Sequence, residues 1–331
     1  MKSNYRYIVK AFMAMAVIAG TTSCDDFLDR EPMSSISPET YYSTAAQLEA
    51  NLNDEYPNVL PSFGQWTYGI FGEDKGTDNQ IEVNANDRYT QDRWKVPHSE
   101  SDNWKFERIY RINFFLSEAL PKFGEDMSGS QNTISGSVAT IKHYIGEMYF
   151  LRAYEYFKKL QLFGDFPIIN QPLADEMEAL REASKRFPRN EVARFIISDL
   201  DKAYAYMSDV DMATTRINKD VAMLVKSRVA LFEATWLQNF KGTAFVPGGE
   251  GWPGASLHNN YQYPSGNIDN EVKYFLEQAV EASKLVADKY KGSLTENTGV
   301  LQQSADDPSN PYFDMFAQED LSDVKEVLLW R

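Results

Sequence analysis

The chain has 331 residues, a formal net charge of −15, 14% aromatic side chains and one cysteine. That length suffices for one large domain or two smaller ones with a sizeable core, while the acidity excludes bulk attraction to nucleic acid or to an anionic surface. A single cysteine rules out an intramolecular disulfide, so packing must supply the stability.

The first thirty residues have the pattern of a bacterial export signal. A positively charged start is followed by a short apolar run over 11–19, and small residues then lead to Cys24. The run is too short for a bilayer span, which takes about 20 residues, so residues 1–23 are predicted to be a signal peptide that is removed. Acylation of Cys24 then fastens the mature N-terminus to a membrane. The alternative is ordinary cleavage near Gly20 with a free thiol at Cys24, because Thr21 stands where leucine is usual.

A polar, lipidated leash is predicted for residues 24–37, and the first helix is expected to follow it. The tripeptide Ser-Pro-Glu at 37–39 is typical of a helix start, because serine caps the N-terminus, proline suits the first helical position and an acid favours the positive end. This helix is expected to run to Tyr56 and to be closed by the prolines after it. Residues 58–103 mix Gly, Asp, Asn and aromatics without a period, which indicates an irregular loop.

Five later segments repeat apolar residues at spacings of three and four, the period of an amphipathic helix. They are 106–120, 137–163, 192–207, 221–236 and 272–290. The second is apolar nearly all round and is therefore expected to be buried on two sides. Because strand alternation is scarce, we predict a mostly α fold with little β: an irregular, TPR-like stack of helix hairpins with long loops and no strict 34-residue repeat.

Two further segments differ from these helices. Residues 241–270 form a long loop rich in glycine, proline and aromatics, and such loops are often functional. The apolar run 324–331 is predicted to be a strand, and its abrupt end leads us to expect that the chain is a fragment.

Several residues on helical stripes are assigned structural roles. Trp104 and Trp236 are expected in the core, and Asn113 with Arg152 is expected to form a buried hydrogen-bonded pair that fixes helix register. The Gly-Asp pair at 164–165 is interpreted as a turn at a helix end.

The residues from 150 to 168, FLRAYEYF followed by LFGDFPI, resemble the signature helix and turn of the SusD/RagB family. These proteins are outer-membrane nutrient-uptake lipoproteins of Bacteroidota. Further similarity lies in Tyr-Arg-Ile-Asn at 110–113, in Thr-Arg-Ile-Asn-Lys at 215–219 and in the acidic run at 25–29, which resembles a surface-export signal. The resemblance covers nearly the whole mature chain, although family members are usually longer, so a C-terminal part is expected to be missing from the domain at 38–331.

The resemblance implies a lid-like protein, anchored by lipid at the cell surface, that captures a nutrient for a SusC-type TonB-dependent outer-membrane transporter. An oligosaccharide is the expected cargo, and an oligopeptide is the alternative, because fold alone does not settle cargo. Nucleic acid is not an expected partner.

A glycan site needs aromatic platforms for the apolar faces of sugars and polar side chains for their hydroxyls. Both predicted loops offer such residues, at about 58–103 and 241–270. The candidate ligand-binding residues are Trp66, Tyr68, Asp78, Asn79, Arg88, Trp94, Trp252, Tyr261 and Tyr263. The alternative for each aromatic is that it anchors its own loop to the helical body.

Signatures of catalysis are scarce in the sequence. The three histidines are far apart, and neither a zinc-protease motif nor a phosphate loop with lysine occurs. We therefore predict a binding protein with no catalytic residue, metal or cofactor, apart from a structural calcium ion considered for residues 74–87. A surface glycoside hydrolase stays as the less favoured alternative, because 48 acidic residues leave a catalytic carboxylate pair open.

Overall fold

The second of two compact units, residues 1–42 and 43–331, contains all the helices that the structure defines. The computed structural model describes residues 41–61, 103–124, 126–208, 212–301, 304 and 306–331. The helices are α3 (Ala45–Val59), α4 (Glu107–Phe123), α5 (Val138–Phe163), α6 (Met177–Ala183), α7 (Arg189–Tyr206), α8 (Lys219–Asn239), α9 (Ile268–Tyr290) and α10 (Pro311–Ala317), with a 3-10 turn at Pro253–Ser256. Among the described residues, β pairing is limited to two isolated bridges. The predicted mostly α fold is confirmed.

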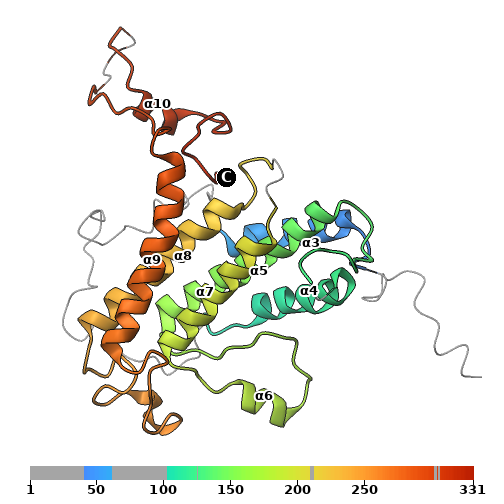
Figure 1. Cartoon of the computed structure of the whole chain (residues 1–331), viewed down its shortest axis with the longest axis vertical. Coiled ribbons are helices and arrows are strands. Elements are labelled where there is room, and N and C mark those ends of the chain that lie inside the picture. Colours follow the sequence, from blue (N-terminus) through green and yellow to red (C-terminus); the bar gives the residue numbers. More distant parts are fainter. Residues whose placement is uncertain (1–40, 62–102, 125, 209–211, 302–303, 305) are drawn as a thin grey trace, which may run out of the picture. The chain divides into compact units, whose positions relative to one another are not determined.

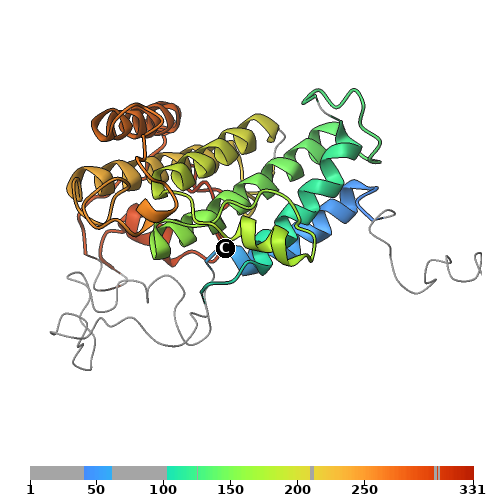
Figure 2. The same cartoon turned by 90° about the horizontal axis from the view of Figure 1, so that it is seen from below.

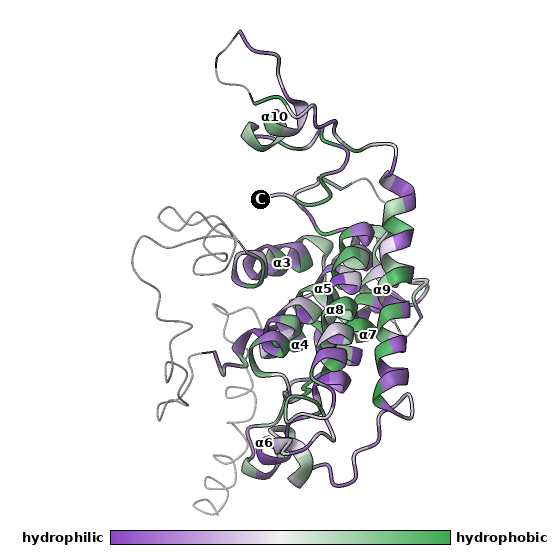
Figure 3. Cartoon of the chain, turned by 90° about the vertical axis from the view of Figure 1, so that its left-hand side faces the viewer, coloured by the Kyte–Doolittle hydropathy of each residue, from purple (hydrophilic) through white to green (hydrophobic). Residues whose placement is uncertain are grey.

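The long helices pack in the order of the chain. α4 lies on α5, α5 on α7, α7 on α8 and α8 on α9, while α3 also packs on α5 (Figures 1 and 2). Hydrophobic residues concentrate between α5, α7 and α8 (Figure 3). α5 is buried on two sides, as its apolar composition predicted, and residues from Ile141 to Leu160 contribute to the core.

The first helix begins later than predicted. Residues 41–44 are not helical, and α3 starts at Ala45 behind a capping box in which Thr44 and Gln47 exchange side-chain and backbone hydrogen bonds. This reciprocal pair satisfies two backbone N–H groups at the start of the helix. Pro57 lies inside the last turn and does not close the helix, which continues to Val59.

Clear end signals bound α5, α8 and α9. The Ser137 side chain caps α5, and Gly164 ends it with a φ of 68°, a backbone region that favours glycine. Asn218 and Asn267 cap α8 and α9 with their side chains. The predicted turn at residues 164–165 is confirmed.

Buried arginine–carboxylate pairs connect successive helices. Arg152 of α5 donates to both carboxylate oxygens of Asp199 on α7, at 2.7 and 2.8 Å, and to the side-chain oxygen of Asn113 on α4 at 2.9 Å. The predicted buried pair of Asn113 and Arg152 is confirmed, with Asp199 as the neutralising partner. Such a group is stable only when every charge has a partner, so this cluster fixes the register of three helices.

Two expectations about the C-terminal half are wrong in detail, and two short helices were not predicted. The buried stripe of α9 runs through Phe275, Ala279, Ala282 and Val286, whereas Leu276 of the predicted stripe is exposed. The run at 324–331 forms no strand; Trp330 instead hydrogen-bonds Thr214 through its backbone and its indole nitrogen. The short helices α6 and α10 had no predicted counterpart.

Within the described ranges, no helix combines the length and the apolar character that crossing a membrane requires.

Candidate functional site

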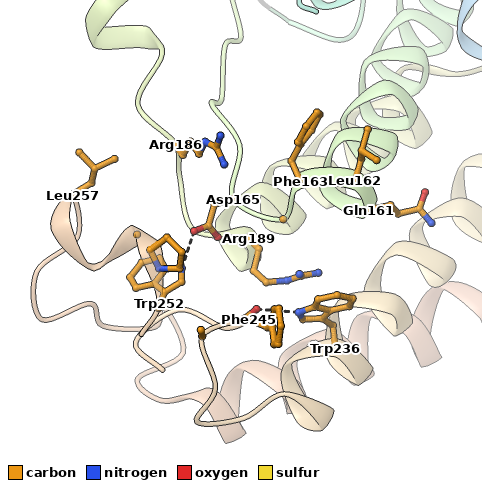
Figure 4. Close-up of a pocket in the computed structure, with 14 residues that line it drawn as sticks. Gln161, Leu162, Phe163, Asp165, Arg186, Arg189, Trp236, Phe245, Trp252 and Leu257 are labelled. Carbon is orange, nitrogen blue, oxygen red and sulfur yellow. Dashed lines mark hydrogen bonds between the residues drawn. The ribbon is translucent and has the colours of Figure 1, made fainter. Parts of the chain in front are cut away.

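A pocket lies where the end of α5, the start of α7 and the 241–270 loop meet (Figure 4). Its volume is about 620 Å³. Its walls are mainly apolar and aromatic, with a few polar groups. In ligand sites, such polar groups typically fix the orientation of the ligand. The principal lining side chains are Gln161, Leu162, Phe163, Asp165, Arg186, Arg189, Trp236, Phe245, Trp252 and Leu257.

One wall is an aromatic surface open to solvent. The ring of Phe245 is 61% exposed, although its backbone oxygen accepts a hydrogen bond from the Trp236 indole nitrogen at 3.0 Å. The rings of Trp236, Phe240 and Phe245 contact one another in series, with centroids 4.6 and 5.4 Å apart. A large exposed ring that is fixed through its own backbone is a ready platform for the apolar face of a ligand.

Below this wall lies a buried ion pair. Arg189, at the start of α7, donates to both carboxylate oxygens of Glu233 on α8, with distances of 2.9 to 3.2 Å. Its guanidinium lies 4.1 Å from the ring centroid of Trp236. Arg189 thus orients the Trp236 ring and is itself neutralised, so it contributes shape rather than free charge to the pocket.

Asp165 joins three elements at the opposite wall. Its Oδ1 accepts from the backbone N–H of Arg189 at 2.9 Å, and its Oδ2 accepts from the indole nitrogen of Trp252 at 2.7 Å. Burial raises the pKa of Asp165, although the two donors and the nearby arginines oppose that shift. The carboxylate therefore caps α7, which has no side-chain cap at Pro188, and ties the 241–270 loop to the end of α5.

The 241–270 loop is held to the helices by its own aromatic residues. Trp252 is only 5% exposed and packs against His258, with ring centroids 5.9 Å apart. The Tyr261 hydroxyl exchanges hydrogen bonds with the Asn190 amide at 2.9 and 3.1 Å. The Tyr263 hydroxyl donates to the carbonyl of Pro247 at 2.7 Å. Burial raises the pKa of both tyrosines, so their hydroxyls stay protonated and available as donors.

With this geometry defined, comparison with known proteins gives a clear match. Residues 26–231, more than half of the chain, match a family model named SusD-like and described as starch-binding and associating with the outer membrane. The chain belongs to the SusD-like family. The resemblance seen in the sequence is therefore confirmed.

Relatives within the SusD-like family are distant in sequence. SusD-like protein P2 of Formosa agariphila is 25% identical over 253 residues, which is 73% of this chain and 46% of that protein. SusD-like protein P25 of the same organism is 25% identical over 65% of this chain and 41% of its own length. A SusD-like carbohydrate-binding protein from Bacteroides fragilis aligns with a TM-score of 0.45 and 15% identity, over 78% of this chain and 43% of the other. This SusD-like chain thus spans less than half the length of these proteins.

The predicted ligand residues divide into two groups in this SusD-like chain. Trp252 lines the pocket, while Tyr261 and Tyr263 support the loop behind it; all three have partners inside the protein, and their contact with a glycan stays a prediction. The rest lie outside the described residues, as do Cys24 and the calcium segment 74–87. They are Trp66, Tyr68, Asp78, Asn79, Arg88 and Trp94. No group of three or more metal-ligating side chains occurs in the described part of the chain.

Sequence reasoning missed the residues that line the pocket most openly. Phe245 lies in the predicted loop, and its position beside glycine and proline was a usable signal. No sequence signal pointed to Arg186 or Gln161, because their place at the pocket depends on where α5 ends and on the bridge between Phe166 and Phe187. Trp236, expected in the core, is half-buried and lines the pocket, and half-buried Trp104 lies just before α4 rather than on it.

Proposed function

We propose that this SusD-like chain is a cell-surface lipoprotein that captures an oligosaccharide and passes it to a SusC-type TonB-dependent transporter. Family membership supports association with the outer membrane and a carbohydrate ligand. The observation that carries the proposal for the pocket is the exposed Phe245 ring beside Trp236, facing a space of about 620 Å³. Sugar rings present apolar faces that such a surface binds, while their hydroxyls suit the amide of Gln161 and the guanidinium of Arg186.

The carboxyl chemistry of the pocket supports binding without catalysis. Glycoside hydrolysis needs two carboxyl groups on either side of the scissile bond. Among the described residues that line the pocket, Asp165 is the single carboxylate, and each of its oxygens already accepts a hydrogen bond.

The anchor belongs to the same proposal. Acylation of Cys24 after removal of residues 1–23 tethers the protein, and two or three acyl chains give essentially irreversible membrane attachment at about 0.8 kcal/mol per buried methylene. The tether and the transporter keep the local concentration of partners high, so modest glycan affinity suffices. The aromatic and polar candidates in the 58–103 loop are proposed to contribute further ligand contacts.

Calorimetric titration with a panel of oligosaccharides tests the binding role. Phe245→Ala is expected to lower the affinity for the oligosaccharide that binds best by about tenfold, which corresponds to about 1.4 kcal/mol of binding free energy. Phe313→Ala is the matched control, because that ring is 60% exposed on α10 and does not line the pocket. Equal affinity of both variants would contradict the assignment of the pocket, and chromatographic detection of shortened oligosaccharides would favour a hydrolase.

The anchor and the partner need separate measurements. Labelled palmitate should enter the wild-type protein and not Cys24→Ala, and the protein on whole cells should be open to added protease. Affinity capture from outer membranes should recover a TonB-dependent transporter. Absence of label together with protection from protease would end the lipoprotein part of the proposal.

A further inference from the structure

Arg186 differs in its charge environment from the other arginine of the pocket. Arg189 is buried and fully paired with Glu233. Arg186 is exposed, lines the pocket, and has no carboxylate within ion-pair distance among the described residues. A guanidinium carries five N–H donors and stays charged at every physiological pH, so Arg186 presents to the pocket a positive charge that has no ion-pair partner among the described residues.

Arg186 is held in place through both its guanidinium group and its backbone. Its guanidinium lies 4.6 Å from the ring centroid of Trp104, which packs against Phe163 and Phe166 at 4.9 and 4.8 Å. Its backbone oxygen accepts a hydrogen bond from His258 Nε2 at 2.8 Å. The next residue along, Phe187, forms a two-way backbone bridge with Phe166. An arginine stacked on an aromatic ring keeps its donor edge free and loses little entropy when it binds.

The negative charge of Asp165 leaves these donors open. Its two oxygens accept from the Arg189 backbone and from the Trp252 indole, so the carboxylate is turned toward the protein rather than toward Arg186 (Figure 4). Arg186 forms no ion pair with Asp165 among the described residues, although its charge is one of those that oppose the rise in the Asp165 pKa. The acid excess of the whole chain acts weakly at this point, because charges are screened beyond about 8 Å at physiological ionic strength.

We propose that the pocket takes an acidic oligosaccharide, whose carboxylate or sulfate group pairs with Arg186 while a sugar face packs on Phe245. This inference rests on the proposed function and names the class of cargo. Carboxylate and sulfate oxygens match the planar fork of a guanidinium, and such charge-assisted pairs are about twice as strong as neutral hydrogen bonds. Gln161, on the opposite side of the pocket from Arg186 (Figure 4), supplies a neutral donor and acceptor for a hydroxyl of another sugar unit.

The test compares three probes in calorimetric titrations: a neutral β-glucan oligosaccharide, an oligogalacturonate and a sulfated galactan oligosaccharide. At least one acidic probe is expected to bind about tenfold more tightly than the neutral one, and its affinity should fall as salt is raised. Arg186→Gln should remove this preference, and Arg186→Lys should restore part of it, because lysine keeps the charge without the fork. The two acidic probes distinguish carboxylate from sulfate.

Arg181→Gln is the matched control. Arg181 is exposed, forms no ion pair among the described residues, and lies outside the pocket on α6, so its replacement changes net charge by the same amount. If Arg186→Gln and Arg181→Gln weaken an acidic probe equally, or if the neutral probe binds best while Phe245→Ala still weakens it, the acidic-cargo proposal is overturned and the proposed function stands. If no probe binds, or none responds to Phe245→Ala, the proposed function at this pocket fails as well.

Discussion

Replacing Asp165 should disconnect the 241–270 loop from the helices. In the wild type, one carboxylate caps the first N–H of α7 and also accepts the Trp252 indole proton. Asp165→Ala leaves both donors without a partner. Asp165→Asn keeps one acceptor oxygen and therefore satisfies one donor, but its NH₂ group cannot accept the other.

The cost follows from these two contacts. Loss of a helix cap costs about 1 kcal/mol, and a buried donor without a partner, here the indole of Trp252, costs about 1–3 kcal/mol. Asp165→Ala should therefore lower the free energy of unfolding by about 2–4 kcal/mol. At about 2–4 °C per kcal/mol for a domain of roughly this size, Tm should fall by about 5–15 °C. Asp165→Asn should show about half of that loss.

Thermal unfolding followed by circular dichroism measures the global effect, and limited proteolysis measures the loop. The 241–270 segment should be cut earlier in Asp165→Ala than in the wild type. Asp175→Ala, an exposed aspartate beyond the pocket, is the control and should stay within about 0.5 kcal/mol. The reasoning is refuted if Asp165→Ala matches that control, or if Asp165→Asn is as damaging as alanine.

Three further predictions concern the helical body. Burial alone would raise the pKa of Glu271, but hydrogen bonds, first of all from Arg194, lower it below the ordinary value of 4.5. The ionised carboxylate therefore stabilises the fold above that pH. Glu271→Gln should lower the free energy of unfolding most at neutral pH, and progressively less when denaturation is repeated below pH 4.5. Gly146→Ala puts a Cβ 2.8 Å from the backbone nitrogen of Met207, at the C-terminal end of α7, and should lower the free energy of unfolding in urea by about 1–3 kcal/mol, unlike Gly292→Ala at an open site. Asp199→Asn leaves the buried charge of Arg152 without its carboxylate partner and should lower the free energy of unfolding by about 3–5 kcal/mol. A melting temperature near that of the wild type would contradict the role given to this ion pair.

Sequence periodicity located the five long helices, because each buries a stripe at helical spacing. It failed where two local signals competed or where a partner was required. The serine-proline pattern at 37–39, outside the described residues, and the Thr44–Gln47 capping box both resemble a helix beginning, and α3 begins at the second. The apolar run at 324–331 has strand composition, but a strand needs a neighbouring edge, and the described residues provide none.

The pocket was predictable only in part. The 241–270 loop was correctly singled out, but the partners of its aromatics lie 71 and 87 positions away, at Asn190 and Asp165, and no local pattern reveals such pairs. The exposed ring at Phe245 and the free charge at Arg186 depend on those long-range contacts. Composition indicates that aromatics are available, whereas tertiary structure decides which ones support the loop and which one faces solvent.

The sequential packing of the helices has a consequence for how the chain reaches its native state. Because α5, α7, α8 and α9 each rest on the preceding long helix, most contacts join segments that are near in sequence. Chains with low contact order fold quickly. Assembly can therefore advance along the chain as each helix hairpin becomes available.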